Sequence, residues 1–321
     1  MTLKILGTGS GLPEKVVTND DLAEIMETSD EWIASRTGIR KRHISVTETT
    51  TDLAITAAKN ALENAGTSVD DIDLIIVGTI SPTHFYPSCA CEVQAALGAT
   101  KAVAFDVSAA CSGFLFGLNT AYAYFMAGIY KKAIIIGAEN LSKMMDWNDR
   151  STCVLFGDGA GAAVVEASEE VGLMAMTMGS DGASGMNLTC KNRPINNPYS
   201  PHEEPLDYTS MNGQEVYKFA VKTVPKAITE VLDQAGLTPD DVDVYLLHQA
   251  NLRILESVAK RLKQPMEKFP IQLTETANTS AASVPLLLDY ANRSGIIKKG
   301  DKILLAGFGG GLTWGAALVT W

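Results

Sequence analysis

Two apolar stretches frame a short polar junction around residue 111. The first, residues 103–107, is a brief apolar run that predicts a strand. The second, residues 112–128, is apolar nearly all round and contains no proline, which predicts a buried helix. Cys111 lies between them, where unpaired backbone N–H groups and the positive end of a helix dipole favour a thiolate. The pattern therefore predicts an activated thiol at a helix start.

The same succession of elements occurs twice along the chain. Gly66 matches Gly236, which gives an offset of 170 residues. The matching segments are 58–77 with 228–247, 133–137 with 303–307 and, at a shorter offset of 154, 161–165 with 315–319. A repeat this long indicates a duplicated α/β domain rather than a solenoid.

Each copy is predicted to run strand, helix, strand, buried helix, strand, strand. This order implies two mixed sheets with helices between and around them. We divide the chain into an N-terminal half, residues 1–170, which carries the cysteine, and a C-terminal half, residues 171–321.

The duplication also predicts which polar residues meet. Cys111 corresponds to Ala281, at the start of the second expected buried helix. A pseudo-twofold axis would bring the two helix starts together, and Asn278 with them. His248 follows the apolar run 244–247, at the carboxyl end of an expected strand, where α/β folds usually carry their chemistry. Taken alone, Cys111 is interpreted as a packing residue and His248 as a structural one; their expected convergence with Asn278 reverses both interpretations.

Composition narrows the class of protein. The chain has 321 residues, 46% of them hydrophobic, which is ample core for two fused domains. Five cysteines without framework spacing favour a reducing, cytoplasmic setting. Cys89 and Cys91 are too close for a usual zinc knuckle, and no apolar stretch is long enough to span a membrane. The net charge of −11 opposes nucleic-acid binding.

Four segments carry a family signature: residues 108–114, 248–251, 278–282 and 307–315. Together they resemble the β-ketoacyl-acyl-carrier-protein synthase III family, the condensing enzymes of the thiolase-like superfamily that start bacterial fatty acid synthesis. The likeness includes residues 28–39 and 147–152 and covers essentially the whole chain. It implies a thiolase-like α/β fold, with two duplicated mixed-sheet halves stacked as α-β-α-β-α layers.

The resemblance implies an acyltransferase reaction in two steps. Cys111 would take an acyl group from a short acyl-CoA primer, while backbone N–H groups of Cys111 and Gly310 hold the oxyanion. Malonyl-acyl-carrier protein would then lose carbon dioxide, and His248 and Asn278 would stabilise the enolate that attacks the acyl group. The product would be a 3-oxoacyl-carrier protein. No metal or redox cofactor is required, and the expected partners are the carrier protein and a second copy of the chain.

The resemblance also assigns binding residues. Those for coenzyme A are Thr28, Trp32, Arg36, Arg150 and Asn251. A Trp face and an Arg plane suit a purine ring, and Arg suits phosphate. Phe308 would line the acyl pocket, and Tyr86 would cap it across the dimer interface. The family often has Phe at that position, so the preferred primer stays open.

A basic face is predicted on the helix that follows Asn251. Its inward residues are expected to be Leu252, Leu255, Val258, Ala259 and Leu262. Arg253, Lys260 and Arg261 fall on the other side. A solvated face is the ordinary interpretation. On a chain this acidic, the stripe is also suited to docking an acidic carrier protein, and Arg253 matches the family's carrier-binding arginine.

Other interpretations remain beside this one. A chalcone-synthase-like polyketide enzyme shares Cys, His and Asn and is the main alternative. A thiolase would need a second catalytic cysteine, yet none follows Cys190, and an elongating synthase would have His where Asn278 stands. A catalytically silent partner subunit is the non-enzyme alternative, and the intact Cys111, His248 and Asn278 argue against it.

Overall fold

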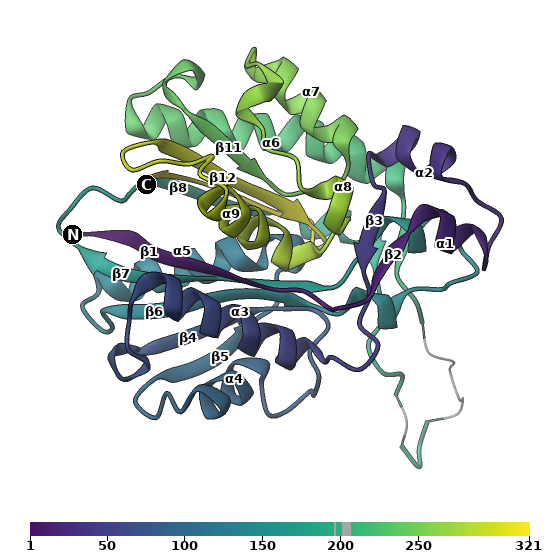
Figure 1. Ribbon diagram of the computed structural model, residues 1–321, viewed down its shortest axis with the longest axis horizontal. Coiled ribbons are helices and arrows are strands. Elements are labelled where there is room, and N and C mark those ends of the chain that lie inside the picture. Colours follow the sequence, from purple (N-terminus) through teal and green to yellow (C-terminus); the bar gives the residue numbers. More distant parts are fainter. Residues whose placement is uncertain (196, 201–206) are drawn as a thin grey trace.

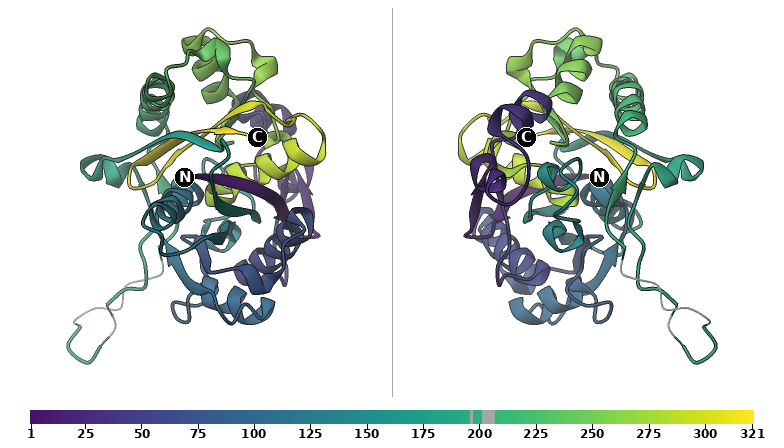
Figure 2. Two further views of the ribbon diagram at one scale, coloured as in Figure 1. Left: turned by 90° about the vertical axis from the view of Figure 1, so that its left-hand side faces the viewer. Right: turned by 90° about the vertical axis from the view of Figure 1, so that its right-hand side faces the viewer.

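The computed structural model describes residues 1–195, 197–200 and 207–321. Five layers stack on one another, with helices outside, two sheets inside them and two helices at the centre (Figure 1). Figure 2 shows the same stack from its two ends, with one pair of outer helices on each side. The predicted α-β-α-β-α arrangement of two mixed sheets is confirmed.

The first sheet has the order β1-β7-β6-β4-β5. Its strands are β1 (Thr2–Gly11), β4 (Leu74–Gly78), β5 (Val103–Val107), β6 (Lys132–Glu139) and β7 (Gly159–Ser168). β4 pairs in parallel with β5 and β6, whereas β7 pairs antiparallel with β6 and β1. The parallel strands read as continuous apolar runs because helices cover both of their faces.

The second sheet repeats this order without the last strand. It runs β8-β13-β12-β11, from β8 (Leu173–Ser180), β11 (Val244–Leu247), β12 (Lys302–Gly309) and β13 (Thr313–Thr320). β11 and β12 are parallel and the remaining pairs antiparallel. The segment that corresponds to β5 forms the short helix α8 (Leu273–Thr276) instead.

Two buried helices form the central layer, α5 (Gly113–Met126) and α9 (Ser283–Arg293). α5 confirms the buried helix predicted over residues 112–128. Each helix is preceded by one 3₁₀ turn, η2 (Ala110–Ser112) and η8 (Ser280–Ala282), and these turns are related by the same offset of 170. One hydrophobic core joins both helices to the inner faces of both sheets. Fully burying a large apolar side chain contributes about 1.5–3 kcal/mol, so this layer holds the two halves together.

Helices on the outer faces close the stack. α3 (Thr50–Ala65) and α4 (Cys89–Leu97) pack on the first sheet, and α6 (Gly213–Ala235) and α7 (Leu252–Leu262) on the second. The remaining elements lie at one end of the molecule or in the long connection after β8: α1 (Asn19–Ala23), α2 (Asp30–Thr37), β2 (Val16–Thr18), β3 (Lys41–His43), β9 (Leu188–Thr189) and β10 (Ser210–Met211) (Figure 1).

Candidate active site

Cys111 lies in the η2 turn, at the point where β5 gives way to α5. Its side chain is buried. The preceding residue, Ala110, has a φ of 44°, and its repeat mate Ser280 has a φ of 49°. Left-handed backbone costs a non-glycine residue about 1–2 kcal/mol. Both helix starts therefore hold the same strained turn, which presents the residue that follows it.

Gly309, at the end of β12, lies against the thiol. A Cβ atom built on Gly309 would lie 2.7 Å from the Cβ and 2.8 Å from the Sγ of Cys111. No side chain fits there without displacing the nucleophile. The next residue, Gly310, has more room, since a Cβ there would lie 3.4 Å from the nearest atom, the Cβ of Ala110. Glycine at 309 is thus required by close packing on Cys111.

The thiol of Cys111 is protonated at neutral pH. Burial raises its pKa to about 11, although the hydroxyl of Ser280 and the backbone N–H groups of Cys111 and Gly310 favour the thiolate and oppose that rise. The expectation of a lowered pKa is therefore wrong for the ligand-free site, because desolvation outweighs the hydrogen bonds. The two N–H groups that were assigned to the oxyanion hole do face the Sγ atom.

His248 directly follows β11, as expected, and is buried. Its ring meets that of Phe308 edge to face, with centroids 5.2 Å apart. Phe308 and Gly309 are consecutive, so one strand end contacts both His248 and Cys111. Burial lowers the pKa of His248 to about 3, which keeps the imidazole neutral. Its Nδ1 atom has no hydrogen-bond partner among the described residues.

Gln249 joins the His248 strand end to the segment that carries Asn278. Its backbone N–H donates to Ser283 Oγ at 2.7 Å, and its side-chain Oε1 accepts from the N–H groups of Gln272 and Leu273. Asn278 itself is buried, and its Oδ1 accepts from the N–H of Ser280 at 2.9 Å. That bond leaves the Nδ2 amide, a donor, as the outward end of the side chain.

The two helix starts meet as the repeat predicted. A Cβ atom on Gly113, at the start of α5, would lie 3.2 Å from the Cβ of Ala281 in η8. Gly307 packs on the carbonyl oxygen of Cys111, as its repeat mate Gly137 packs on that of Ala281. The structure thus gathers Cys111, Ser280 and the N–H of Gly310 into one region, with His248 and Asn278 on the segments that border it.

Trp32, Arg36 and Arg150 form a cluster at the end of the molecule that carries α2. The guanidinium carbon of Arg36 lies 4.7 Å from the centre of the Trp32 ring, and that of Arg150 lies 5.1 Å from it. Arg150 also donates to the carbonyl oxygen of Glu27. The hydroxyl of Thr28 is buried without a hydrogen-bond partner among the described residues.

The start of α7 is tied to this cluster. Asn251 caps the helix by accepting from the N–H of Arg253, and its Nδ2 donates to the carbonyl oxygen of Arg36 at 3.1 Å. The side chain of Arg253 donates to the carbonyl oxygen of Ser35 at 2.9 Å. Arg253, Lys260 and Arg261 are exposed, as predicted.

One detail of the predicted inward face of α7 is wrong. Ile254 is buried, whereas Leu252 is half-buried. The reason is that Leu252 packs sideways on the backbone of Gly38, where α2 ends, rather than on the sheet.

Tyr86 is 88% exposed, on the connection between β4 and α4. Its neighbour Phe85 is 58% exposed, and Arg193 lies over the Phe85 ring at 5.1 Å. A single chain therefore does not bring Tyr86 to the buried thiol. The capping role assigned to Tyr86 depends on a second copy and stays a prediction.

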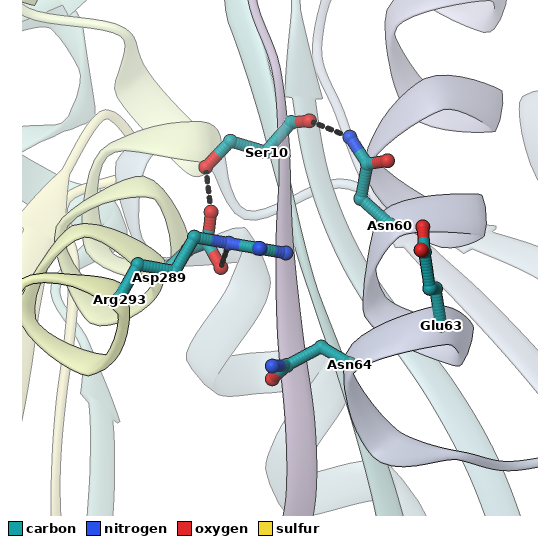
Figure 3. A pocket seen from close by; sticks show the side chains of 6 residues that line it. All are labelled: Ser10, Asn60, Glu63, Asn64, Asp289 and Arg293. Carbon is teal, nitrogen blue, oxygen red and sulfur yellow. Dashed lines mark hydrogen bonds and ion pairs between the residues drawn. The ribbon is translucent and has the colours of Figure 1, made fainter.

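A polar cleft lies elsewhere, between α3 and α9 across β1 (Figure 3). Its residues bond to one another: Ser10 Oγ donates to Asp289, which also accepts from Arg293 at 2.8 Å, and Asn60 donates to the backbone of Ser10. No nucleophilic thiol lines it. We therefore assign the chemistry to the Cys111 region and not to this cleft.

Two searches of the described residues found nothing. They contain no group of three or more His, Cys, Asp or Glu side chains that could hold a metal ion. None of their helices is both long and apolar enough to cross a membrane.

Sequence reasoning missed two polar residues beside the thiol, Ser280 and Glu139. Glu139 is fully buried at the end of β6, and its Oε1 accepts from Ser280 Oγ at 3.1 Å. The offset of 170 was the available signal, because it pairs Glu139 with Gly309 and Ser280 with Ala110.

Comparisons with known proteins agree with this geometry. The family model "3-Oxoacyl-[acyl-carrier-protein (ACP)] synthase III" matches residues 105–182, and the model of its C-terminal part matches residues 232–321. A β-ketoacyl-[acyl-carrier-protein] synthase III of Clostridium acetobutylicum is 48% identical over 321 residues, which is 100% of this chain and 99% of the relative.

Solved structures give the same result. The 3-oxoacyl-[acyl-carrier-protein] synthase III of Aquifex aeolicus superposes with a TM-score of 0.94 at 45% identity, covering 99% of this chain and 100% of that one. The priming β-ketosynthase of the R1128 polyketide pathway superposes with a TM-score of 0.93 at 36% identity, covering 99% and 96%.

Proposed function

Because the chain belongs to the 3-oxoacyl-[acyl-carrier-protein] synthase III family and is one of its condensing enzymes, acyltransferases that initiate fatty acid synthesis, we propose that Cys111 is the residue that carries the acyl group. The primer is a short acyl-CoA and the extender is malonyl-acyl-carrier protein. The products are a 3-oxoacyl-carrier protein, carbon dioxide and coenzyme A.

In the first step, the Sγ of Cys111 attacks the thioester carbonyl and the coenzyme A thiol leaves. The N–H groups of Cys111 and Gly310 hold the oxyanion of the tetrahedral intermediate. The orientation of both N–H groups toward Sγ supports this assignment. A preorganised donor pair of this kind stabilises charge only as it develops, which lowers the barrier rather than tightening substrate binding.

In the second step, malonyl thioester loses carbon dioxide, and its enolate attacks the acyl group on Cys111. His248 and the Nδ2 of Asn278 donate hydrogen bonds to the thioester oxygen of the malonyl group. Support comes from the lowered pKa of His248, which keeps it a neutral donor, and from the Ser280 N–H that fixes the Asn278 amide. A buried neutral donor stabilises the enolate without holding malonate back as a salt bridge would.

The coenzyme A end of the primer binds at Trp32 and Arg150, with the purine between the ring and the guanidinium. Arg150 lies over the bare Trp32 ring, so it must swing away from that face to admit adenine. Arg36 is placed for phosphate, the unpartnered Thr28 hydroxyl for a polar group of the nucleotide, and Asn251 for the pantetheine arm.

The carrier protein docks on the exposed face of α7 that contains Arg253, Lys260 and Arg261. Asn251, at the start of that helix, is bonded to Arg36, so a carrier on this face would deliver its arm beside the coenzyme A site. Positive charge on a chain with a net charge of −11 favours an acidic partner there.

The acyl pocket is completed by a second copy of the chain. β5 is an edge strand with half-exposed residues, and Phe85 and Tyr86 are large exposed side chains on the preceding connection. An unpaired strand edge beside exposed aromatic residues suits a twofold pairing. Phe308 lines the pocket from within the chain. The proposed halves, 1–170 and 171–321, then supply nucleophile and enolate donors respectively; the cytoplasmic location stays a prediction.

One observation carries the proposal above the others. Gly309 packs so closely on Cys111 that only glycine fits, at a strand end whose next residue supplies an N–H to the Sγ. The test is product formation from acetyl-CoA and malonyl-carrier protein, read by mass. C111A should form no 3-oxoacyl product, and the matched variant C91A should form it at the wild-type rate. Equal product from C111A would refute the proposal.

A further inference from the structure

Glu139 is a buried carboxylate that the steps above do not use. It accepts from Ser81 Oγ at 2.5 Å, from the N–H of Ile80 at 3.2 Å and from Ser280 Oγ at 3.1 Å. These donors are neutral, although burying a carboxylate without a cation is costly. Ionisable groups kept at such a cost are candidates for function.

The repeat explains where this carboxylate lies. Glu139 is the mate of Gly309, Ser280 of Ala110 and Ala281 of Cys111. The second helix start therefore has no thiol but carries a hydroxyl and a carboxylate where the first has a methyl group and no side chain. The N–H of Ala281, mate of the proposed oxyanion donor, favours the ionised form of Glu139 and lowers its pKa. Glu139 thus fills the counterpart of the oxyanion hole.

Ser280 links this second site to the first. Its hydroxyl donates to Glu139, and the same hydroxyl faces the Sγ of Cys111 and favours the thiolate. The two turns touch through Gly113 and Ala281, so no other layer separates the groups. Ser280 is 2% exposed and Glu139 fully buried, which keeps bulk water from serving as the proton acceptor.

The thiol needs such an acceptor. With its pKa raised to about 11 by burial, Cys111 holds its proton at neutral pH. His248, with a pKa lowered to about 3, is a weak base. Burial raises the pKa of Glu139 to about 7, against the hydrogen bonds that favour its ionised form. A base poised near the working pH transfers protons most effectively.

Other titratable groups around Glu139 are worse placed for this task. Lys143 lies close enough for each charge to act on the other, but its Nζ already donates to the carbonyl oxygens of Ser81 and Pro82. Burial raises the pKa of Cys89 to about 12. Asp158 accepts from Ser142 and from the N–H of Ser45, away from the thiol.

We propose that Ser280 and Glu139 form a proton relay that deprotonates Cys111 as it attacks the primer. This inference rests on the proposed acylation of Cys111. The S–H proton passes to Ser280 Oγ while the hydroxyl proton of Ser280 passes to Glu139 Oε1. The C–S bond to the acyl group forms, the bond to coenzyme A breaks, and the proton returns through the relay to the departing thiolate, so coenzyme A leaves as a thiol. Glu139 acts through Ser280 and is a positioning residue.

The test is the single-turnover rate of Cys111 acylation by acetyl-CoA between pH 5.5 and 9, read by quenched-flow and intact mass. In the wild type, the rate should rise with pH as Glu139 ionises and level off above about pH 7. E139Q and S280A should each acylate about 100-fold more slowly, the lower end of a general-base contribution. Both should lose the rise near pH 7. The double variant should be about as slow as either single one, because one relay cannot be broken twice.

Decarboxylation of malonyl thioester is the internal control, since it needs His248 and Asn278 but no thiol proton transfer. The variants should retain it, and T279A, which removes a neighbouring hydroxyl, should acylate at the wild-type rate. Should E139Q fail to fold, S280A decides alone. Unchanged acylation rates and pH profiles would overturn the relay, as would a parallel loss of decarboxylation in both variants. A wild-type protein that never acylates at Cys111 would instead sink the proposed function itself.

Discussion

Replacing Gly309 with alanine tests the packing that places the nucleophile. The new Cβ would lie 2.7 Å from the Cβ and 2.8 Å from the Sγ of Cys111, whereas unstrained carbon contacts are about 3.5–4.0 Å. Cys111 must therefore move by about 1 Å. A misplacement of that size costs about 100-fold in rate, or about 2.7 kcal/mol of barrier. Overpacking of this kind destabilises a fold by about 1–3 kcal/mol.

The assay is the acylation rate of Cys111 by acetyl-CoA, with thermal unfolding measured on the same samples. G309A should stay folded and lose about two orders of magnitude in rate. The matched control is G310A, whose Cβ would meet nothing closer than 3.4 Å and whose backbone N–H is retained. It should keep most of the wild-type rate. If G309A and G310A acylate equally fast, Gly309 does not hold the nucleophile in place and the reasoning is wrong.

Three further predictions concern the other roles. H248A and N278A should still acylate Cys111 but lose malonyl decarboxylation by about 100-fold, the usual effect of removing an oxyanion donor; wild-type decarboxylation in either variant would refute its role. W32A should raise KM for acetyl-CoA with little change in kcat, because it removes binding remote from the reacting carbon; a kcat loss alone would contradict this. R253E should lower kcat/KM for malonyl-carrier protein far more than acylation by acetyl-CoA, and the difference should shrink at high salt, where screening lengths fall below about 8 Å; equal losses for both substrates would rule out docking.

The repeat made most of the fold predictable. Matching apolar runs 170 residues apart specify two similar sheets, and an all-round apolar stretch such as residues 112–128 can only be a helix buried between layers. The repeat also implied a counterpart to β5, but residues 273–276, with two threonines and a glutamate, form α8 instead. Local composition outweighed the duplication there.

The site was predictable only in part. Residue types and the repeat brought Cys111, His248 and Asn278 toward one region, because both helix starts lie on the same axis. The direction of the Cys111 pKa shift was not predictable, since it depends on how completely neighbouring segments exclude water. Glu139 was missed because a single acidic residue after an apolar strand usually faces solvent, and only the three-dimensional structure shows it buried.

The most direct test of the account is the covalent intermediate. The wild-type protein, incubated with acetyl-CoA alone, is digested and its five cysteine-containing sites are mapped by mass spectrometry. We predict one acetyl group on Cys111, absent from C111S and released when malonyl-carrier protein is added. An acetyl group found only at another cysteine, or a Cys111 adduct that malonyl-carrier protein does not discharge, would contradict the central claim.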